Sequence, residues 1–258
     1  MHPVLLKLGP LTIHTYGFFI AIGFVTAIFI AKNESIKVEI DPEVMMDLCF
    51  YMLISGLIGA RIFYVIIEWD TFSNNLLEIF KIWHGGLVFF GGFIFSMFFC
   101  FFYVKKYKID FLKTVDILAP CIAIAHAFGR LGCFSAGCCY GKACDLPWAV
   151  TFTHPQTLAL QNTPLHPVQI YSAFMNLFIF IVLMYYRRSN KIDGMISVLY
   201  LFMYGIGRFL VEFFRGDDRG TFVFNAFSPA QFIGIMLIIL SFILYIILKK
   251  KNNYSRYS

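Results

Sequence analysis

Seven long apolar segments divide the chain, and they limit the possible folds more than any other feature of the sequence. They lie at residues 14–32, 45–67, 86–104, 113–130, 168–186, 193–214 and 229–248. Each has about 17–23 residues, enough for a helix to cross about 30 Å of hydrocarbon. Only 14% of the residues are charged, whereas soluble domains carry about 25%. The sequence therefore predicts an all-α integral membrane protein with seven transmembrane helices, forming one domain over residues 1–258.

The basic residues predict the orientation of these helices. Clusters such as Lys105 and Lys106, and Lys249 to Lys251, follow alternate segments and would face the cytoplasm. This predicts an outer N-terminus and an inner C-terminus, with an outer-face loop over residues 131–167. The net charge of +6 reflects this pattern, so no nucleic-acid partner is expected. The first ten residues make a poor signal peptide, and we expect the first segment to be retained.

The stretch from Gly129 to Gly141 joins the fourth apolar segment to this loop. It reads Gly-Arg-Leu-Gly-Cys-Phe-Ser-Ala-Gly-Cys-Cys-Tyr-Gly. Its glycines permit sharp turns and close approach of the backbone to a ligand. Arg130 is predicted to lie where the helix meets the loop, and a charge at that depth needs either a partner or a function.

A second polar group lies at the end of the sixth segment. Arg208, Glu212 and Arg215 share one helical face because they are spaced at i, i+4 and i+7. One interpretation is an ion pair between helices, and the other is an anion clamp in which Glu212 orients the arginines. Arg61 and Arg130 add positive charge at a similar depth, although Arg61 has a possible partner in Glu68. A phosphate-bearing lipid headgroup would balance the excess positive charge.

Other polar residues have both structural and functional interpretations. Tyr16 suits an interfacial anchor or a hydrogen-bond donor to a headgroup. The run Trp83-His84-Gly85-Gly86 predicts a broken entry into the third segment, while Gly91 and Gly92 suit either a ligand or close helix packing. His166 precedes a proline and marks the start of the fifth segment. His126 suits a core histidine or a base.

Four of the seven cysteines fall in or beside the loop, at Cys133, Cys138, Cys139 and Cys144. The spacing C-x4-C-C-x4-C is not that of a zinc site, so neither a metal nor a cofactor is predicted. One or two disulfides bracing the loop are the simpler expectation on an oxidising outer face. A thiolate nucleophile activated by Arg130 is the alternative.

The order of these motifs resembles that of the prolipoprotein diacylglyceryl transferase family. The resemblance runs from the first segment to the end of the sixth. It rests on Tyr16-Gly17, Gly59-Ala-Arg61, Trp83-x-Gly-Gly-Leu, Gly129-Arg130-x-Gly132-x-Phe134, His166-Pro-x-Gln169-x-Tyr171 and Gly207-Arg208-Phe-x-x-Glu212-Phe-Phe-Arg215-x-Asp217.

The resemblance implies a seven-helix inner-membrane enzyme that acts on phosphatidylglycerol. Such enzymes move the diacylglyceryl group to the lipobox cysteine of a prolipoprotein, next to its signal peptide, and release glycerol-1-phosphate. By position, Arg130, Arg208 and Tyr16 would be catalytic. The residues that would bind the substrate are Arg61, Gly132, Glu212, Arg215, His166, Gln169 and Tyr171.

The chain departs from the family pattern at two places. Cys133, Ala136 and Cys138 replace two asparagines and a glutamate of the signature, and Phe90 stands where the family has a histidine. A thiol role for Cys133, Cys138 or Cys139 is therefore also considered. The alternative functions are transfer from a glycerophospholipid to another acceptor, thiol–disulfide exchange at the membrane, and lipid binding without chemistry.

Overall fold

The computed structural model describes residues 3–8, 11–73, 75–81, 85–189, 192–217 and 227–257. Within these ranges, seven helices are long and apolar enough to cross a membrane, as the sequence predicts. They are α1 (Thr15–Ile36), α2 (Pro42–Ile67), α4 (Phe89–Tyr107), α5 (Phe111–Ala136), α6 (Val168–Arg187), α7 (Met195–Glu212) and α8 (Pro229–Tyr257). The protein is thus a multi-pass membrane protein.

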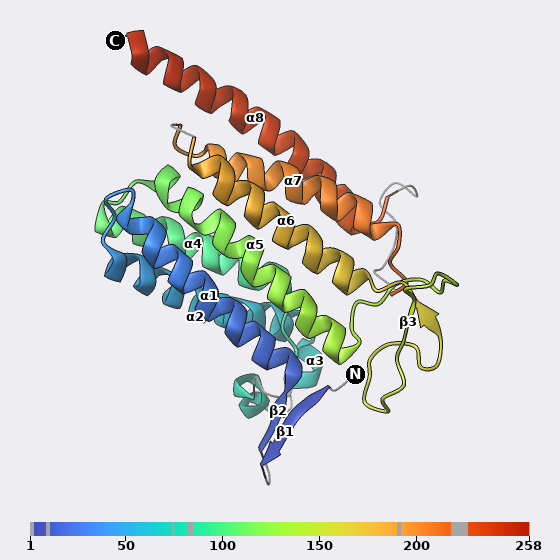
Figure 1. Cartoon of the computed structure of the whole chain (residues 1–258). Coiled ribbons are helices and arrows are strands. Elements are labelled where there is room, and N and C mark those ends of the chain that lie inside the picture. The colour runs from blue at the N-terminus through green and yellow to red at the C-terminus, as the bar shows by residue number, and fades with distance from the viewer. Residues whose placement is uncertain are drawn as a thin grey trace. The chain divides into compact units, whose positions relative to one another are not determined.

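Short elements join these helices. They are β1 (Val4–Leu8), β2 (Leu11–His14), α3 (Trp69–Phe72), the 3-10 helix η1 (Leu76–Phe80), β3 (Val150–Thr151) and β4 (Pro164–Leu165). The strands pair antiparallel as β1 with β2 and β3 with β4. The chain forms two compact units, a large unit of residues 1–30 and 115–258 and a small unit of residues 31–114 (Figure 1).

One predicted boundary is wrong in a way that matters for the site. Helix α5 continues through Ala136 instead of ending at Arg130, so the loop begins at Gly137 and not at residue 131. Gly137 has φ of 78° and ends the helix, because this conformation suits glycine. Arg130 and Cys133 are therefore helical residues.

In the small unit, α2 and α4 pack closely through glycines. A Cβ atom on Gly59 would lie 2.6 Å from the Gly91 carbonyl oxygen, and one on Gly91 would lie 2.4 Å from the Gly59 oxygen. Glycine is required at both positions because any side chain would collide with backbone. Packing is therefore the role of Gly91 in this structure.

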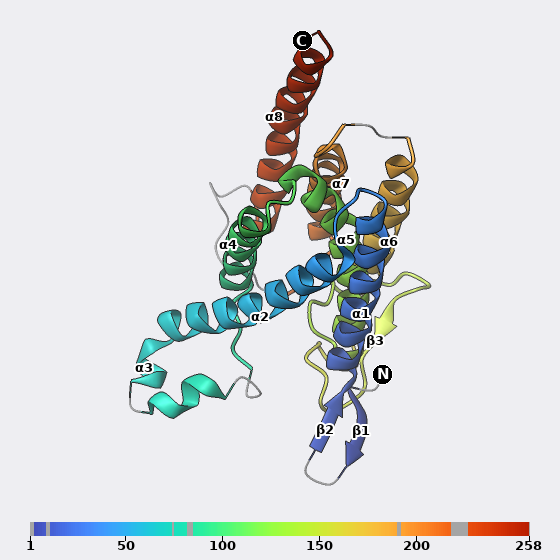
Figure 2. The same cartoon turned by 90° about the vertical axis from the view of Figure 1, so that its left-hand side faces the viewer.

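In the large unit, α7 lies beside both α6 and α8 (Figures 1 and 2). Gly205 of α7 meets Gly234 of α8, where an added Cβ on either would come within 2.9 Å of the other's carbonyl oxygen. Asp116 of α5 is buried and accepts hydrogen bonds from the backbone nitrogens of Gly194 (2.7 Å) and Ser197 (2.8 Å). This carboxylate caps the start of α7, which explains an acidic residue inside an apolar segment.

Candidate functional site

A small polar cavity in the large unit brings Arg130 of α5 and Arg208 of α7 together. Its volume is about 10 Å³, and it is lined by His126, Arg130, Ser172, Met175, Asn176, Tyr204, Arg208 and Val211. The Arg130 Nε atom donates to His126 Nε2 over 3.1 Å. His126 is therefore an acceptor at Nε2 and holds the arginine in place. The two predicted catalytic arginines thus face one space.

Glu212 links Arg208 to Arg215, as the sequence spacing predicts. Its Oε2 atom lies 2.9 Å from Arg208 Nη1 and 3.9 Å from Arg215 Nε. Its Oε1 atom accepts from the Ser228 hydroxyl over 3.0 Å. Arg215 also makes a paired contact with Asp217, at 2.9 and 2.8 Å. Glu212 thus contacts Arg208 and Arg215, Asp217 contacts Arg215, and Arg130 contacts neither carboxylate, so this group of three arginines carries an excess of positive charge.

Helix α6 contributes a buried polar stripe to the same region. Gln169, Ser172 and Asn176 are all buried, and Ser172 and Asn176 line the arginine cavity. The Oδ1 atom of Asn176 and the Oε1 atom of Gln169 have no hydrogen-bond partner among the described residues. Ser172 and Asn176 were not predicted from the sequence, although polar residues at i, i+3 and i+7 of an apolar helix indicate a buried polar face.

Backbone hydrogen bonds join three loop segments around this site. The Lys142 nitrogen donates to the Phe214 oxygen over 2.9 Å, and the Gly216 nitrogen donates to the Tyr140 oxygen over 3.1 Å. The His166 nitrogen donates to the Lys142 oxygen over 2.9 Å. The segment after the cysteines is thereby fixed between the end of α7 and the start of α6. This is why His166 and Arg215, far apart in sequence, contribute to one region.

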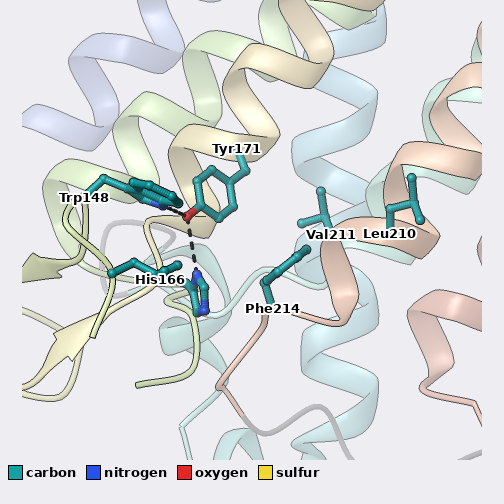
Figure 3. Close-up of a pocket in the computed structure, with 7 residues that line it drawn as sticks. Trp148, His166, Tyr171, Leu210, Val211 and Phe214 are labelled. Carbon is teal, nitrogen blue, oxygen red and sulfur yellow. Dashed lines mark hydrogen bonds between the residues drawn. The ribbon is translucent and has the colours of Figure 1, made fainter. Parts of the chain in front are cut away.

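An apolar cavity of about 390 Å³ lies at this junction (Figure 3). It is lined by Leu146, Trp148, His166, Tyr171, Leu210, Val211 and Phe214. The Tyr171 hydroxyl accepts from Trp148 Nε1 over 2.8 Å and lies 3.3 Å from His166 Nδ1. His166 and Tyr171 therefore support each other at the cavity wall, and Val211 lines both this cavity and the arginine cavity.

Gly132 allows Tyr16 to pack directly on α5. A Cβ atom at Gly132 would lie 3.1 Å from both the Cδ2 and the carbonyl oxygen of Tyr16. Tyr16 as a whole residue is 42% exposed. Tyr16 also lies within electrostatic range of Arg130 and of three cysteines. The structure thus brings this predicted residue to the same site.

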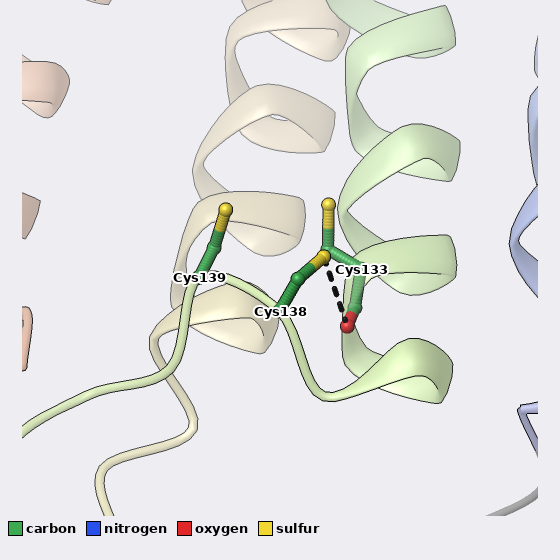
Figure 4. Close-up of side chains that lie close together, drawn as sticks. All are labelled: Cys133, Cys138 and Cys139. Atoms are coloured by element: carbon green, nitrogen blue, oxygen red, sulfur yellow. Dashed lines mark hydrogen bonds between the residues drawn. The ribbon is translucent and has the colours of Figure 1, made fainter. Parts of the chain in front are cut away.

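Those three cysteines, Cys133, Cys138 and Cys139, form a cluster at the end of α5 (Figure 4). Their Sγ atoms all lie within 4.8 Å of one another. All seven cysteines lie in the described residues and none forms a disulfide, so the expected bracing disulfides are wrong. The hydrogen bonds with Cys133 and Cys138, and the adjacent guanidinium of Arg215, lower the pKa of the Cys139 thiol. The loop is braced by backbone hydrogen bonds instead.

Arg61 has a different environment, in the small unit. It donates to the backbone oxygens of five residues: Glu78, Ile79, Lys81, Gly85 and Gly86. The guanidinium also contacts the Tyr64 and Phe72 rings, with Cζ to centroid distances of 5.6 and 5.1 Å. These contacts, and not an ion pair with Glu68, satisfy Arg61. Gly85 and Gly86 have positive φ and turn their carbonyls toward it.

Three other positions that the sequence singled out, Trp83, His84 and Phe90, belong to this region of the chain. Trp83 and His84 lie outside the described residues. Phe90, at the start of α4, is 54% exposed and packs edge to face against Phe89, with centroids 5.9 Å apart. It has no titratable group.

Comparison with known proteins places the chain in a family. A family model described as prolipoprotein diacylglyceryl transferase matches residues 3–247. The chain belongs to this family. A protein of Clostridium tetani named phosphatidylglycerol–prolipoprotein diacylglyceryl transferase is 37% identical over 93% of this chain and 95% of its own length.

Proteins of the same name in two other organisms are also similar. That of Finegoldia magna is 36% identical over 90% of this chain and 88% of its own length. That of Streptococcus pyogenes serotype M3 is 33% identical over 100% of this chain and 99% of its own length. The prolipoprotein diacylglyceryl transferase family therefore accounts for nearly the whole chain, and the arginine cavity lies within the matched residues.

Proposed function

We propose that this protein transfers the diacylglyceryl group of phosphatidylglycerol to the cysteine thiol of a prolipoprotein and releases glycerol-1-phosphate. The family and the names of its relatives support this activity. We infer that the reaction takes place in the bacterial plasma membrane: the relatives are bacterial proteins, and seven helices of the chain are long and apolar enough to cross a membrane. Phosphatidylglycerol, the prolipoprotein and the surrounding lipids are then its partners.

One observation supports the chemistry best: Arg130 and Arg208 line the same polar cavity from two helices. Arginine binds phosphate oxygens through two parallel N–H donors, so two facing arginines suit a phosphodiester. Negative charge grows on the phosphate as the carbon–oxygen bond breaks. Fixed cations stabilise the transition state, in which this charge has grown, more than they stabilise the ground state, and this lowers the activation barrier.

Glu212 and Arg215 act as positioning residues in this proposal. Glu212 holds Arg208 at 2.9 Å and is itself held by Ser228, so the Arg208 guanidinium is oriented before the lipid arrives. Preorganisation of this kind avoids a reorganisation cost during reaction. Tyr16, packed on Gly132, supplies a hydroxyl donor to the headgroup.

The apolar cavity beside His166 and Tyr171 suits an apolar part of a substrate. Its wall is formed by aromatic and aliphatic side chains, and Val211 connects it to the arginine cavity. An acyl chain or the apolar region of a signal peptide would bury surface there, at about 25 cal/mol for each Å². His166 and Tyr171 would then mark the boundary between the apolar and polar parts of the substrate, while Gln169 supports the cysteine turn through its bond to the Cys138 oxygen.

The test is a transfer assay with purified protein, phosphatidylglycerol and a lipobox peptide. The peptide mass is expected to rise by one diacylglyceryl group, and a peptide with serine for cysteine should gain nothing. Release of glycerol phosphate without a change in peptide mass would instead indicate another acceptor. No release under any condition would contradict the proposed reaction.

A further inference from the structure

The turn after α5 places three thiols together. Gly137 and Cys139 both have positive φ, of 78° and 59°, and they turn the chain so that Cys138 and Cys139 return toward Cys133 (Figure 4). Two hydrogen bonds to backbone carbonyl oxygens fix the conformation of this turn. The Leu158 nitrogen donates to the Ala136 oxygen over 3.1 Å, and Gln169 Nε2 donates to the Cys138 oxygen over 2.8 Å.

The sulfur geometry suits a thiophilic cation. Sulfur ligands lie about 2.3 Å from Zn²⁺, so two of them in a tetrahedral site are about 3.8 Å apart. The three Sγ atoms already lie within 4.8 Å of one another. Small side-chain rotations would close the remaining gap. The Cys138 thiol now donates weakly to the Cys133 oxygen over 3.7 Å, and that contact ends when the thiol gives up its proton to bind a metal.

The charges around the cluster provide a second, independent argument. Three thiolates with one divalent cation carry a net charge of −1, which needs a nearby cation. Arg215 is beside Cys139, and its side chain is only 2% exposed. Its Nη1 atom has no hydrogen-bond partner among the described residues, although its other two nitrogens contact Asp217. A buried donor of this kind is costly unless an anionic group faces it.

We propose that Cys133, Cys138 and Cys139 bind Zn²⁺ and that its fourth position takes the thiol of the acceptor. Three protein ligands leave one position open, as in catalytic zinc sites, and the cluster is only partly buried. Cys133 lies one helical turn beyond Arg130 on α5, so the metal would stand beside the phosphate site. This inference rests on the proposed function.

The reaction then balances without a base from the protein. The acceptor thiol loses its proton to solvent when its sulfur binds the metal, because a coordinated thiol is deprotonated. The sulfur attacks the terminal glyceryl carbon of the lipid and forms a C–S bond. The C–O bond to phosphate breaks, and its electron pair leaves with glycerol-1-phosphate, which Arg130 and Arg208 hold.

Metal content tests the site itself. The full-length protein, purified with Zn²⁺ present and dialysed, is expected to retain zinc, and Co²⁺ substitution should give the strong absorption of thiolate-to-cobalt charge transfer. Cys138→Ser should lose both signals, while Cys144→Ser should keep them because Cys144 lies outside the cluster. A wild type without zinc or charge-transfer absorption would overturn the proposal, whatever the variants do. Equal signals in Cys138→Ser would also overturn it.

The open position is tested with the Co²⁺ protein and two peptides. A lipobox peptide should shift the cobalt spectrum, and its serine counterpart should not. Stripping the metal should lower transfer at least about a hundredfold, with recovery on adding Zn²⁺. Full transfer by the stripped protein would overturn the metal proposal and leave the proposed function standing. If the lipobox peptide shifts the cobalt spectrum but the zinc-loaded protein transfers no diacylglyceryl group, the proposed function is contradicted and the metal site is supported.

Discussion

Arg61 and the pair Arg130 and Arg208 give the same signal in the sequence, an arginine inside an apolar segment, but the structure uses them differently. A guanidinium has five N–H donors, and those of Arg61 make five hydrogen bonds to backbone oxygens. Arg130 donates only to His126 among the described residues, and Arg208 pairs with Glu212. Arg61 is therefore fully hydrogen-bonded within its own unit, whereas Arg130 and Arg208 have N–H groups without a partner among the described residues, as the proposed phosphate site requires.

The difference lies in what surrounds each charge. The Arg61 guanidinium is surrounded by backbone carbonyls, those of Glu78, Ile79, Lys81, Gly85 and Gly86. The other two arginines face each other across a cavity with unpartnered polar atoms, such as Asn176 Oδ1. A fully hydrogen-bonded charge stabilises structure, whereas a partly bonded one in a cavity is a binding group. The following predictions test that contrast.

The largest effect is expected from Arg130→Gln. It removes a cation from the phosphate site without opening a large void, and we expect kcat/KM for transfer to fall by about 10²–10³-fold. Unfolding in detergent should change little. The same assay on Arg208→Gln should give a comparable loss. Wild-type rates for both variants would contradict the proposal that Arg130 and Arg208 bind the phosphate while Arg61 stabilises the fold.

Arg61→Gln should instead affect stability. It leaves several buried carbonyls without donors, at a cost of about 3 kcal/mol in unfolding free energy. The readout is thermal unfolding followed by tryptophan fluorescence, with the exposed Lys105→Gln as a control. The transfer rate per folded molecule should stay near that of the wild type. A large loss of rate at unchanged stability would mean that Arg61 binds substrate, as the family resemblance implies.

Glu212→Gln sharpens the account of the arginine pair. Loss of the carboxylate charge should release Arg208 and raise KM for phosphatidylglycerol by about tenfold, worth about 1.4 kcal/mol. We expect kcat to fall less, because Glu212 orients an arginine and does not touch the reacting atoms. Steady-state kinetics measure KM and kcat separately. An unchanged KM with a large loss of kcat would indicate that Glu212 acts directly in the chemical step.

The smallest effect is expected from Gly132→Ala. The added methyl would press on Tyr16 at 3.1 Å and displace it by a few tenths of an ångström. Transfer should fall by about two- to fivefold, since the donor geometry is loosened but not lost. Gly129→Ala is the matched control in the same helix, because its nearest contact, Ile20 Cδ1, would be at an ordinary 3.5 Å. Equal losses of transfer activity in both variants would show that the position of Tyr16 does not affect the reaction.

Much of the fold was predictable because membrane spans have a strong signal in sequence. The seven helices follow from apolar length alone. The end of α5 was predicted too early, because Arg130 and the glycines after it suggested a boundary. In fact Arg130 donates to His126 one turn earlier in the same helix, and the helix continues to Ala136.

The site was only partly predictable for a related reason. Spacing put Arg208, Glu212 and Arg215 on one face, and the structure agrees. Spacing along one helix carries no information on contacts across the bundle, such as Ser228 with Glu212. A thiol role for Cys133, Cys138 and Cys139 was considered from the sequence, but their clustering was not predicted. It depends on the positive φ values at Gly137 and Cys139, and not on a familiar C-x-x-C spacing.

Binding of phosphatidylglycerol tests the central claim most directly. We would measure the equilibrium dissociation constant of the lipid, without acceptor, for wild type, Arg208→Gln and Arg61→Gln, each at a temperature where the protein is folded. The account predicts affinity about a hundredfold weaker for Arg208→Gln and unchanged for Arg61→Gln. Unchanged affinity for Arg208→Gln together with lost affinity for Arg61→Gln would contradict it.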